Sequence, residues 1–326
     1  MGLYTARCMR RAVTLLFVLV FAGCGSRVAA TSASVTPKPT LEVTTSPAAS
    51  PAAGRSNQDA VLGPAGMTLQ QEIGAVMMVG FTGSLTPAVL EDWRRHQFGG
   101  LIVVPINQNG GDATAIRQLI QSVRGVMLHP MMAATEQEGG TGQSEMAAMS
   151  RGLKALGFDI NLLPVADAQD VMAAIAGIHA AGMYAAAVHF PGQGVAQDLM
   201  PFRAAIDAHV EFVMVGHLVV PSIDASAPAS MSATVLHLLR KGLGYQGVII
   251  SDDLQLQALG PEYPPPAAAV RFLKNGGDMV IVSHDIAVAD ATYAAIHAAV
   301  LNGSYSRAQL DASVQKLLSL GLRYMP

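Results

Sequence analysis

The sequence predicts a single-domain α/β fold, a (β/α)8 TIM-type barrel, over residues 66–326. Short apolar runs of strand length recur along this region, and each is continuously hydrophobic, as in strands that are covered on both faces. The segments between these runs place apolar residues at helical spacing. Eight such strand–helix units at even spacing are typical of a closed barrel of parallel strands. An open doubly wound sheet is the alternative, but the even spacing and the lack of a glycine-rich nucleotide fingerprint favour closure.

The predicted strands follow one another along the chain, each separated from the next by a helical segment. They are residues 77–81, 101–105, 130–135, 160–166, 184–190, 212–217, 247–252 and 278–284. The clearest helical segments are 85–97 and 233–244, and the second ends at a glycine suited to a helix C-cap. A domain of about 260 residues is long for a single core unless it is an α/β barrel.

A barrel of this kind carries its functional residues at the C-terminal ends of the strands. In this chain polar residues occupy most of those ends: Asn107, Glu136, Gln137, Glu138, Asp167, His189, His217, Asp252, Asp253 and His284. Each of them alone is more often structural than catalytic. Carboxylates and imidazoles that converge on one mouth, however, indicate acid–base or nucleophilic chemistry, including glycosidic cleavage by paired groups.

Residues 1–24 have the features of a secretory signal peptide. Three arginines precede an apolar run at 12–22, which is too short to span a bilayer comfortably. The ending Phe-Ala-Gly-Cys is similar to a bacterial lipobox, so we expect Cys24 to be lipidated. The alternatives are an ordinary cleaved signal and an uncleaved anchor. All three interpretations predict export, and the lipobox predicts a lipid-anchored protein on the outer face or periplasmic side of a membrane.

The composition excludes several classes of function. Residues 25–65 are rich in Ala, Ser, Thr and Pro without any aromatic residue, which predicts a disordered tether ahead of the barrel at 66–326. Of the two cysteines, Cys8 leaves with the signal, so the mature chain cannot form an internal disulfide or a zinc–thiolate site. Removal of the signal also leaves 17 basic and 23 acidic residues, a charge of −6 that argues against nucleic-acid binding.

Seven stretches of the chain occur in an order that resembles the N-terminal catalytic barrel of glycoside hydrolase family 3. The similarity runs from about residue 67 to residue 322, and "GVIISDDLQLQAL" is its most specific part. The stretches are "MTLQQEIGAVMMVGF", "FGGLIVV", "EQEGG", "LGFDINLLPVAD", "HFPGQG", "MVGHLVVPSIDASAPASMS" and "GLGYQGVIISDDLQLQAL". Within the family, the sequence is most similar to single-domain bacterial β-N-acetylglucosaminidases that act on peptidoglycan fragments.

The resemblance assigns roles to four residues. Asp252 matches the family nucleophile, the carboxylate that forms a covalent glycosyl intermediate. Glu136, His189 and His217 match substrate-binding positions, although His189 and His217 could also be structural histidines. Asp253 is expected to cap a helix over "LQLQAL", and Asp167 matches a family position that is more often structural. No nucleotide, flavin or metal cofactor is implied.

Several positions depart from the family pattern. Glu136 replaces an aspartate, Thr141 an arginine and Val188 a lysine, and the long loop after the fourth strand is absent. In the related enzymes the fifth loop ends in Asp-Ser-His, whose Asp–His pair is the general acid/base. Here the matching residues are Asp198, Leu199 and Met200, and methionine cannot transfer a proton. Asp198 therefore remains as a candidate acid/base.

Two main functions follow from this pattern. The first is a retaining exo-glycosidase that cleaves N-acetylglucosamine from cell-wall-derived glycans, with Asp252 as nucleophile and an altered acid/base. The second is a catalytically impaired relative, a surface lipoprotein that binds a glycan or a protein. A metal site formed by Glu136, His189 and His217 is a weaker third, because the three lack local ligand spacing. We expect a monomer whose only link to the membrane is its lipid anchor.

Overall fold

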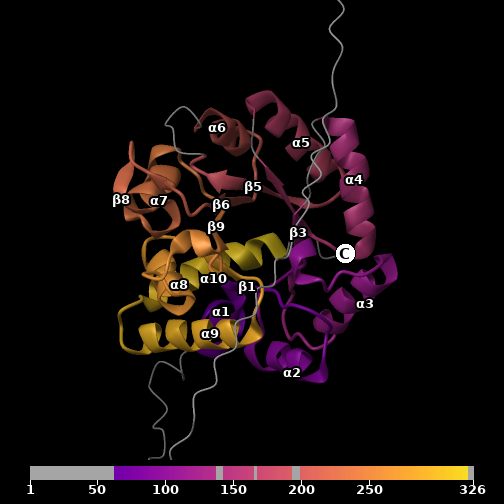
Figure 1. Cartoon of the computed structure of the whole chain (residues 1–326), viewed down its shortest axis with the longest axis vertical. Coiled ribbons are helices and arrows are strands. Elements are labelled where there is room, and N and C mark those ends of the chain that lie inside the picture. The colour runs from indigo at the N-terminus through magenta and orange to yellow at the C-terminus, as the bar shows by residue number, and fades with distance from the viewer. Residues whose placement is uncertain (1–61, 137–141, 165–166, 193–198, 322–326) are drawn as a thin grey trace, which may run out of the picture. The chain divides into compact units, whose positions relative to one another are not determined.

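The computed structural model describes residues 62–136, 142–164, 167–192 and 199–321, so the signal peptide, the tether and Cys24 lie outside the described residues. The described chain forms a closed barrel of eight parallel strands surrounded by helices (Figure 1). The barrel strands are β1 Met77–Val79, β2 Gly100–Ile102, β3 Met132–Glu136, β4 Ile160–Pro164, β5 Tyr184–Phe190, β6 Phe212–Val215, β9 Val248–Asp253 and β10 Met279–Val282. All eight predicted strands are present, and the closed barrel confirms the predicted fold class.

The strands follow chain order around the barrel, and β10 closes the ring by pairing with β1. In that pairing Met77 lies opposite Val280 and Val79 opposite Val282. Most strand residues are buried, in agreement with their continuous hydrophobicity, because side chains face either the barrel interior or the surrounding helices. An exposed residue in a strand is therefore informative, and His189 in β5 is one.

Within the described residues, ten α-helices precede, alternate with or follow the strands. They are α1 Leu69–Ala75, α2 Pro87–His96, α3 Ala113–Arg124, α4 Gln143–Leu156, α5 Ala168–Ala180, α6 Leu199–Asp207, α7 Ala233–His237, α8 Pro265–Lys274, α9 Ile286–Leu301 and α10 Arg307–Gly321. The predicted helix at 85–97 is α2, while 233–244 divides into α7 and a π-helical turn at Leu238–Gly242. None of the described helices is both long enough and apolar enough to cross a membrane.

Aspartates cap three of the helices at the mouth end of the barrel. Asp112 accepts hydrogen bonds from the first backbone N–H groups of α3, and Asp285 does the same for α9. Asp167 caps α5 by accepting from the Gln169 N–H at 2.8 Å. The structural interpretation of Asp167 is therefore correct, and α5 follows β4 closely, as the missing fourth loop predicts.

One feature of the mouth was not predicted. Between β6 and α7 the chain forms a small antiparallel hairpin, in which β7 (Val219–Val220) pairs with β8 (Asp224–Pro228). The Asp224 carboxylate accepts hydrogen bonds from the Ser226 and Ser232 hydroxyls, both at 2.6 Å. These bonds hold the hairpin against the start of α7, so the loop after β6 is an ordered part of the mouth.

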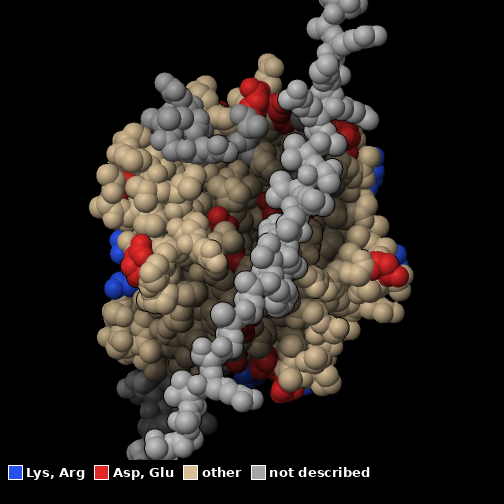
Figure 2. All heavy atoms as spheres, in the orientation of Figure 1, with Lys and Arg blue, Asp and Glu red and all other residues tan. Residues whose placement is uncertain are grey.

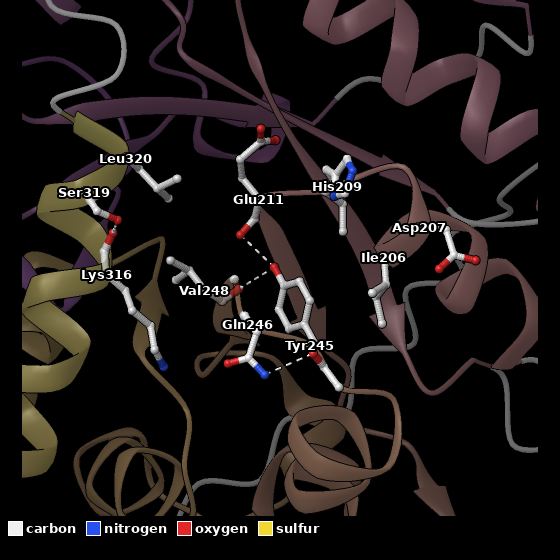
Figure 3. Close-up of a pocket in the computed structure, with 13 residues that line it drawn as sticks. Ile206, Asp207, His209, Glu211, Tyr245, Gln246, Val248, Lys316, Ser319 and Leu320 are labelled. Atoms are coloured by element: carbon white, nitrogen blue, oxygen red, sulfur yellow. Dashed lines mark hydrogen bonds between the residues drawn. The ribbon is translucent and has the colours of Figure 1, made fainter.

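The opposite end of the barrel contains a separate cavity of about 540 Å³ (Figure 3). Its walls come from the segments that precede β6 and β9 and from α10. The Tyr245 hydroxyl points between two backbone carbonyls and donates to Glu211 O at 2.6 Å, with Val248 O at 3.3 Å. These bonds connect the segment before β9 to the segment before β6.

Candidate active site

Three neighbouring strands bring the predicted site residues together. β5, β6 and β9 are adjacent in the barrel, and they carry His189, His217 (two residues beyond the end of β6) and Asp252 respectively. All three residues line one cavity of about 290 Å³ at the C-terminal mouth. Three residues that the sequence analysis singled out therefore lie around one cavity.

Asp252 is positioned by its own strand. Its Oδ1 accepts the Asp253 N–H at 2.8 Å, while its Oδ2 lies 3.8 Å from His189 Nε2. The side chain is 16% exposed, so the carboxylate is partly sheltered from water and still reachable from the cavity. This arrangement leaves one carboxylate oxygen facing the space where a ligand atom would sit.

His189 projects into the mouth. Half of its side-chain surface is exposed, which rules out the interpretation as a buried structural histidine. The neighbouring strand accommodates it through Gly216, where an added Cβ would lie 2.9 Å from the Cβ of His189. Only glycine therefore allows this close approach.

His217 is buried and held on both sides of its ring. Its Nε2–H donates to the Asp253 carbonyl at 2.9 Å, and its Nδ1 lies 2.7 Å from the Ser230 hydroxyl. Burial lowers the pKa of His217, although the nearby charge of Asp252 opposes this effect. A neutral ring fits these partners, because Nδ1 can then accept from Ser230. His217 therefore positions the chain at Asp253 beside the cavity.

Asp253 does not cap a helix, so that prediction was wrong. The chain turns after β9 and forms only a short 3-10 helix at Gln257–Leu259. The Asp253 carboxylate instead accepts from the Ser283 hydroxyl at 2.7 Å and from the Ser283 N–H at 3.1 Å. It also accepts the Gln255 N–H at 3.1 Å. A contact between neighbouring strands replaces the local capping bond that the sequence suggested.

His284 and Asn107 complete this cluster, and the sequence assigned no role to either. His284 Nε2 lies 2.8 Å from Asp253 Oδ2, and its Nδ1 lies 2.7 Å from Asn107 Oδ1. Asn107 in turn donates from Nδ2 to the Ser283 carbonyl at 2.6 Å, which fixes the orientation of its amide. Both residues follow strand ends, and that position was the available signal. Both ring nitrogens of His284 therefore face acceptors, and the ring connects Asp253 to Asn107.

A second cavity, of about 330 Å³, shares the walls of the first. Asp252, His189 and Val188 line both, and Glu136 at the end of β3 lines the second. Glu136 therefore faces the same space as Asp252, as predicted. Val188, which stands where the family has lysine, presents an apolar surface there.

Of the three residues that match the acid/base segment of the family, the structure describes Leu199 and Met200. Asp198 and Thr141 lie outside the described residues. Met200 lies in the first turn of α6, is 63% exposed and is absent from the described lining of both mouth cavities.

The structure does not support the metal-site alternative. Across the described ranges, one group of carboxylates and imidazoles has its ligand atoms within 4.8 Å of one another, and it consists of Asp92, His96 and Asp290 on α2 and α9. Glu136, His189 and His217 do not form such a group. Arg95 already contacts Asp92 and Asp290 with its guanidinium group and donates to His96 Nε2 at 3.2 Å. The positive charge of Arg95 therefore already pairs with the acidic residues of this cluster.

The second half of the barrel matches a known protein family. Residues 164–320 match the model of the family described as "Glycosyl hydrolase family 3 N terminal domain". A β-hexosaminidase from Stenotrophomonas maltophilia (strain R551-3) is 26% identical, over 72% of this chain and 92% of the relative. A β-hexosaminidase from Xanthomonas campestris pv. campestris (strain B100) is 25% identical, over 67% of this chain and 87% of the relative.

Solved structures share the fold. A glycoside hydrolase family 3 β-N-acetylglucosaminidase from Paenibacillus sp. str. FPU-7 superposes with a TM-score of 0.74 at 24% identity, over 79% of this chain and 62% of that chain. A β-N-acetylhexosaminidase from Beutenbergia cavernae DSM 12333 gives a TM-score of 0.67 at 23% identity, over 78% and 98% of the two chains. The matched region, which contains Asp252, is similar to the N-terminal domain of glycosyl hydrolase family 3, and from this match and the β-hexosaminidase relatives we conclude that this chain is a glycoside hydrolase.

Proposed function

We propose that the protein is a retaining exo-glycosidase of the β-N-acetylhexosaminidase type, with Asp252 as its nucleophile. The observation that carries this proposal is the placement of Asp252, a sheltered carboxylate with one oxygen fixed by the backbone and the other open to the cavity. In the first step Asp252 Oδ2 bonds to the anomeric carbon as the glycosidic C–O bond breaks. In the second step water displaces the carboxylate and releases the sugar.

The leaving oxygen needs a proton in the first step, and the attacking water must lose one in the second. We propose Asp198 for both transfers, since Met200 cannot perform them. General acid–base catalysis typically contributes about 10²–10⁴-fold, and poor leaving groups need it most. A weak or badly placed acid would therefore limit the enzyme to substrates with good leaving groups.

The substrate that we propose is a cell-wall-derived glycan with terminal N-acetylglucosamine. The names of the relatives, β-hexosaminidase, support the sugar class. The polar groups of the mouth, Glu136, His189 and Asp252, suit the binding of sugar hydroxyl groups.

The decisive experiment compares two substrates that differ in leaving group. We expect the wild type to hydrolyse 4-nitrophenyl N-acetyl-β-glucosaminide, whose leaving group needs little protonation, faster than a natural disaccharide with a sugar leaving group. Asp252→Asn should lower kcat/KM for the aryl substrate by at least about 10³-fold. Asp207→Asn, a change of the same chemistry at an exposed site near the other end of the barrel, should leave it unchanged.

Three other outcomes would change the proposal. Equal turnover of both substrates would show that the acid/base is intact in spite of Met200. Full activity of Asp252→Asn would refute the nucleophile assignment. Binding of the glycan without turnover of either substrate would favour the impaired, glycan-binding alternative.

We further propose that the mature protein is exported and held at a membrane by lipid on Cys24. The lipobox-like end of the signal peptide supports this proposal. Radiolabelled palmitate should be incorporated into the wild type and not into Cys24→Ala. Release of an unlabelled wild-type protein into the medium would contradict it.

A further inference from the structure

We propose that His284 is an imidazolium in the folded protein, and that this charged ring positions Asp253 and, through it, the proposed nucleophile Asp252. His284 is therefore a positioning residue, which acts through another side chain and not on the substrate itself. This role rests on the proposed glycosidase function and adds to it a proton that the reaction requires. The contacts on every side of the ring carry the proposal.

The ring of His284 lies between two oxygen atoms. Its Nε2 is 2.8 Å from Asp253 Oδ2, and its Nδ1 is 2.7 Å from Asn107 Oδ1. The Asn107 amide cannot be turned the other way, because its Nδ2 donates to the Ser283 carbonyl at 2.6 Å and a carbonyl oxygen only accepts. A neutral imidazole has one N–H, so one of its nitrogens would direct a lone pair at an oxygen. A ring with both protons donates to both partners.

The second proton belongs to the ring and not to the Asp253 carboxylate. Asp253 Oδ1 accepts the N–H groups of Gln255 and Ser283, both at 3.1 Å, and Oδ2 accepts the Ser283 hydroxyl at 2.7 Å. Hydrogen bonds donated to a carboxylate favour its ionised form, and a carboxylic acid is ordinarily a stronger acid than an imidazolium. The Ser283 oxygen, 3.3 Å from each ring nitrogen, can also accept from the ring. His284 and Asp253 therefore form a charge-assisted hydrogen bond.

The backbone of His284 is fixed on both sides of the ring. Its N–H donates to Gln255 Oε1 at 2.8 Å, and its carbonyl accepts from the Thr82 N–H at 3.0 Å and from the Thr82 hydroxyl at 3.1 Å. Asn107 is fully buried, so the second partner is confined as well. After loss of one proton, either tautomer gives up a contact: the hydrogen bond to Asp253, or the one to Asn107 that holds the ring beside Asp253.

The other titratable groups at this cavity are mostly acidic. Those that line it together with His284 are Glu136 from β3, His189 from β5, and Asp252 and Asp253 from β9. Neither lysine nor arginine occurs among the residues described as lining it, and the neighbouring Asp285, which caps α9, adds a further carboxylate. On the face drawn in Figure 2, acidic side chains are likewise visible within the central hollow, and basic ones lie toward the edge. A positive ring offsets part of this negative charge.

Asp253 transmits the position of the ring to Asp252. Its N–H donates to Asp252 Oδ1 at 2.8 Å, and its carbonyl accepts the His217 Nε2–H at 2.9 Å. A reacting group that is misplaced by about 1 Å can cost about 10²-fold in rate. Because the protonated ring is the form that holds Asp253, its contribution to kcat is present at lower pH and is lost as the pH rises.

The protonation state is tested directly on the full-length protein, labelled with ¹⁵N in its histidine rings. The His284 signals are those that disappear in His284→Gln. At about pH 7 we expect a proton on both ring nitrogens, each seen as a one-bond coupling between ¹H and ¹⁵N. A ring with one protonated and one bare nitrogen overturns the proposal. If His284→Gln does not fold, correlation of the wild-type ring to the His284 backbone supplies the assignment.

The effect on the reaction is tested by kinetics with 4-nitrophenyl N-acetyl-β-glucosaminide from about pH 6 to about pH 9. His284→Gln, which like a neutral imidazole offers a donor and an acceptor, should lower kcat about 10–100-fold at the acid end and leave KM nearly unchanged. This gap from the wild type should narrow as the pH rises, because the wild type then loses the proton that the variant lacks. The matched control is His237→Gln, at the exposed last residue of α7, and its kcat should follow that of the wild type.

The failures of the proposal and of the proposed function are distinguishable. A gap between His284→Gln and the wild type that stays constant with pH would make His284 a merely structural residue and overturn the proposal. A wild type that hydrolyses nothing would remove the proposed function, and the positioning role with it, even if both ring nitrogens carry protons. A wild type that is active with a neutral His284 ring would keep the proposed function and overturn the proposal alone.

Discussion

At the scale of single residues, His189 is the residue whose position most clearly suggests a functional role. Its ring lies 3.8 Å from the Asp252 carboxylate and is half exposed in a strand whose other residues are buried. A buried position in a strand would favour an apolar side chain, whereas this exposed imidazole lines the mouth beside Asp252. The same residue lines both mouth cavities and so faces whichever holds the sugar.

We predict that His189→Ala lowers kcat/KM for an aryl N-acetyl-β-glucosaminide by about 10–100-fold, because a lost hydrogen bond to a bound ligand costs about 1.5–3 kcal/mol when a charged group takes part. The loss should appear mainly in KM if His189 holds the sugar equally before and during the reaction. Separate measurement of kcat and KM tests this. A variant with unchanged KM and kcat would remove His189 from the site.

Asp252 and Asp253 show what sequence can and cannot settle about individual residues. The position of Asp252 followed from the end of an apolar run and the family motif. The role of Asp253 did not, because an aspartate after a strand and before "LQLQAL" has the pattern of an N-cap. The carboxylate instead bonds to Ser283, which lies 30 residues away, and no local pattern contains that contact.

At the scale of elements, the end of β9 is fastened to the end of β10. The Asp253 side chain binds Ser283 and His284 just beyond β10, while its backbone N–H and C=O hold Asp252 and His217. One residue thus links the joint between two strands to the geometry of the proposed nucleophile. We therefore expect a loss of the contacts between Asp253 and Ser283 or His284 to shift the position of the Asp252 carboxylate.

We predict that Asp253→Asn destabilises the protein by about 1–3 kcal/mol, because one amide NH2 replaces an oxygen that accepts hydrogen bonds in a buried site. It should also lower kcat while leaving KM nearly unchanged, since Asp252 keeps its charge but loses its fixed position. Denaturant unfolding and steady-state kinetics measure the two effects. Ser283→Ala, which removes a single bond, should show a smaller version of both, and an Asp253→Asn variant with wild-type kcat would refute the link.

Elements differ in how far the sequence predicts them. Continuous apolar runs located every barrel strand, because burial on both faces leaves a strong signal in composition. The β7–β8 hairpin has no such signal, since its strands are short and mostly exposed and it is held by hydrogen bonds from Asp224. The π-helical turn after α7 likewise interrupts a pattern with regular helical spacing.

At the scale of the whole molecule, the first and last helices of the barrel pack together. Glu72 in α1 is fully buried, and its Oε2 lies 2.6 Å from a guanidinium nitrogen of Arg307 in α10. Burial raises the pKa of Glu72 from 4.5 to about 7, and the charge of Arg307 offsets only part of this effect. The contribution of this contact between α1 and α10 to the free energy of unfolding therefore depends on pH.

The sign of this coupling follows from the proton that the folded state keeps. Between pH 4.5 and about pH 7 the unfolded chain loses the Glu72 proton while the folded protein retains it. The free energy of unfolding should therefore fall across this window, by up to about 3 kcal/mol from this residue, and level off above it.

Glu72→Gln tests this prediction, since glutamine keeps the shape of the side chain and does not titrate. The difference in unfolding free energy between Glu72→Gln and the wild type, measured in denaturant from pH 5 to pH 8, should grow in favour of the variant as pH rises. A difference that stays constant with pH would contradict the prediction.

The three strands that carry Asp252, His217 and His189 are consecutive around the barrel, and the region that matches the family begins at Pro164, the last residue of β4. The second half of the barrel carries the proposed nucleophile Asp252, and the first half contributes Glu136 and Ile106 to the cavity that Asp252 lines. A substitution in either half of the barrel can therefore change the shape of the space in front of Asp252.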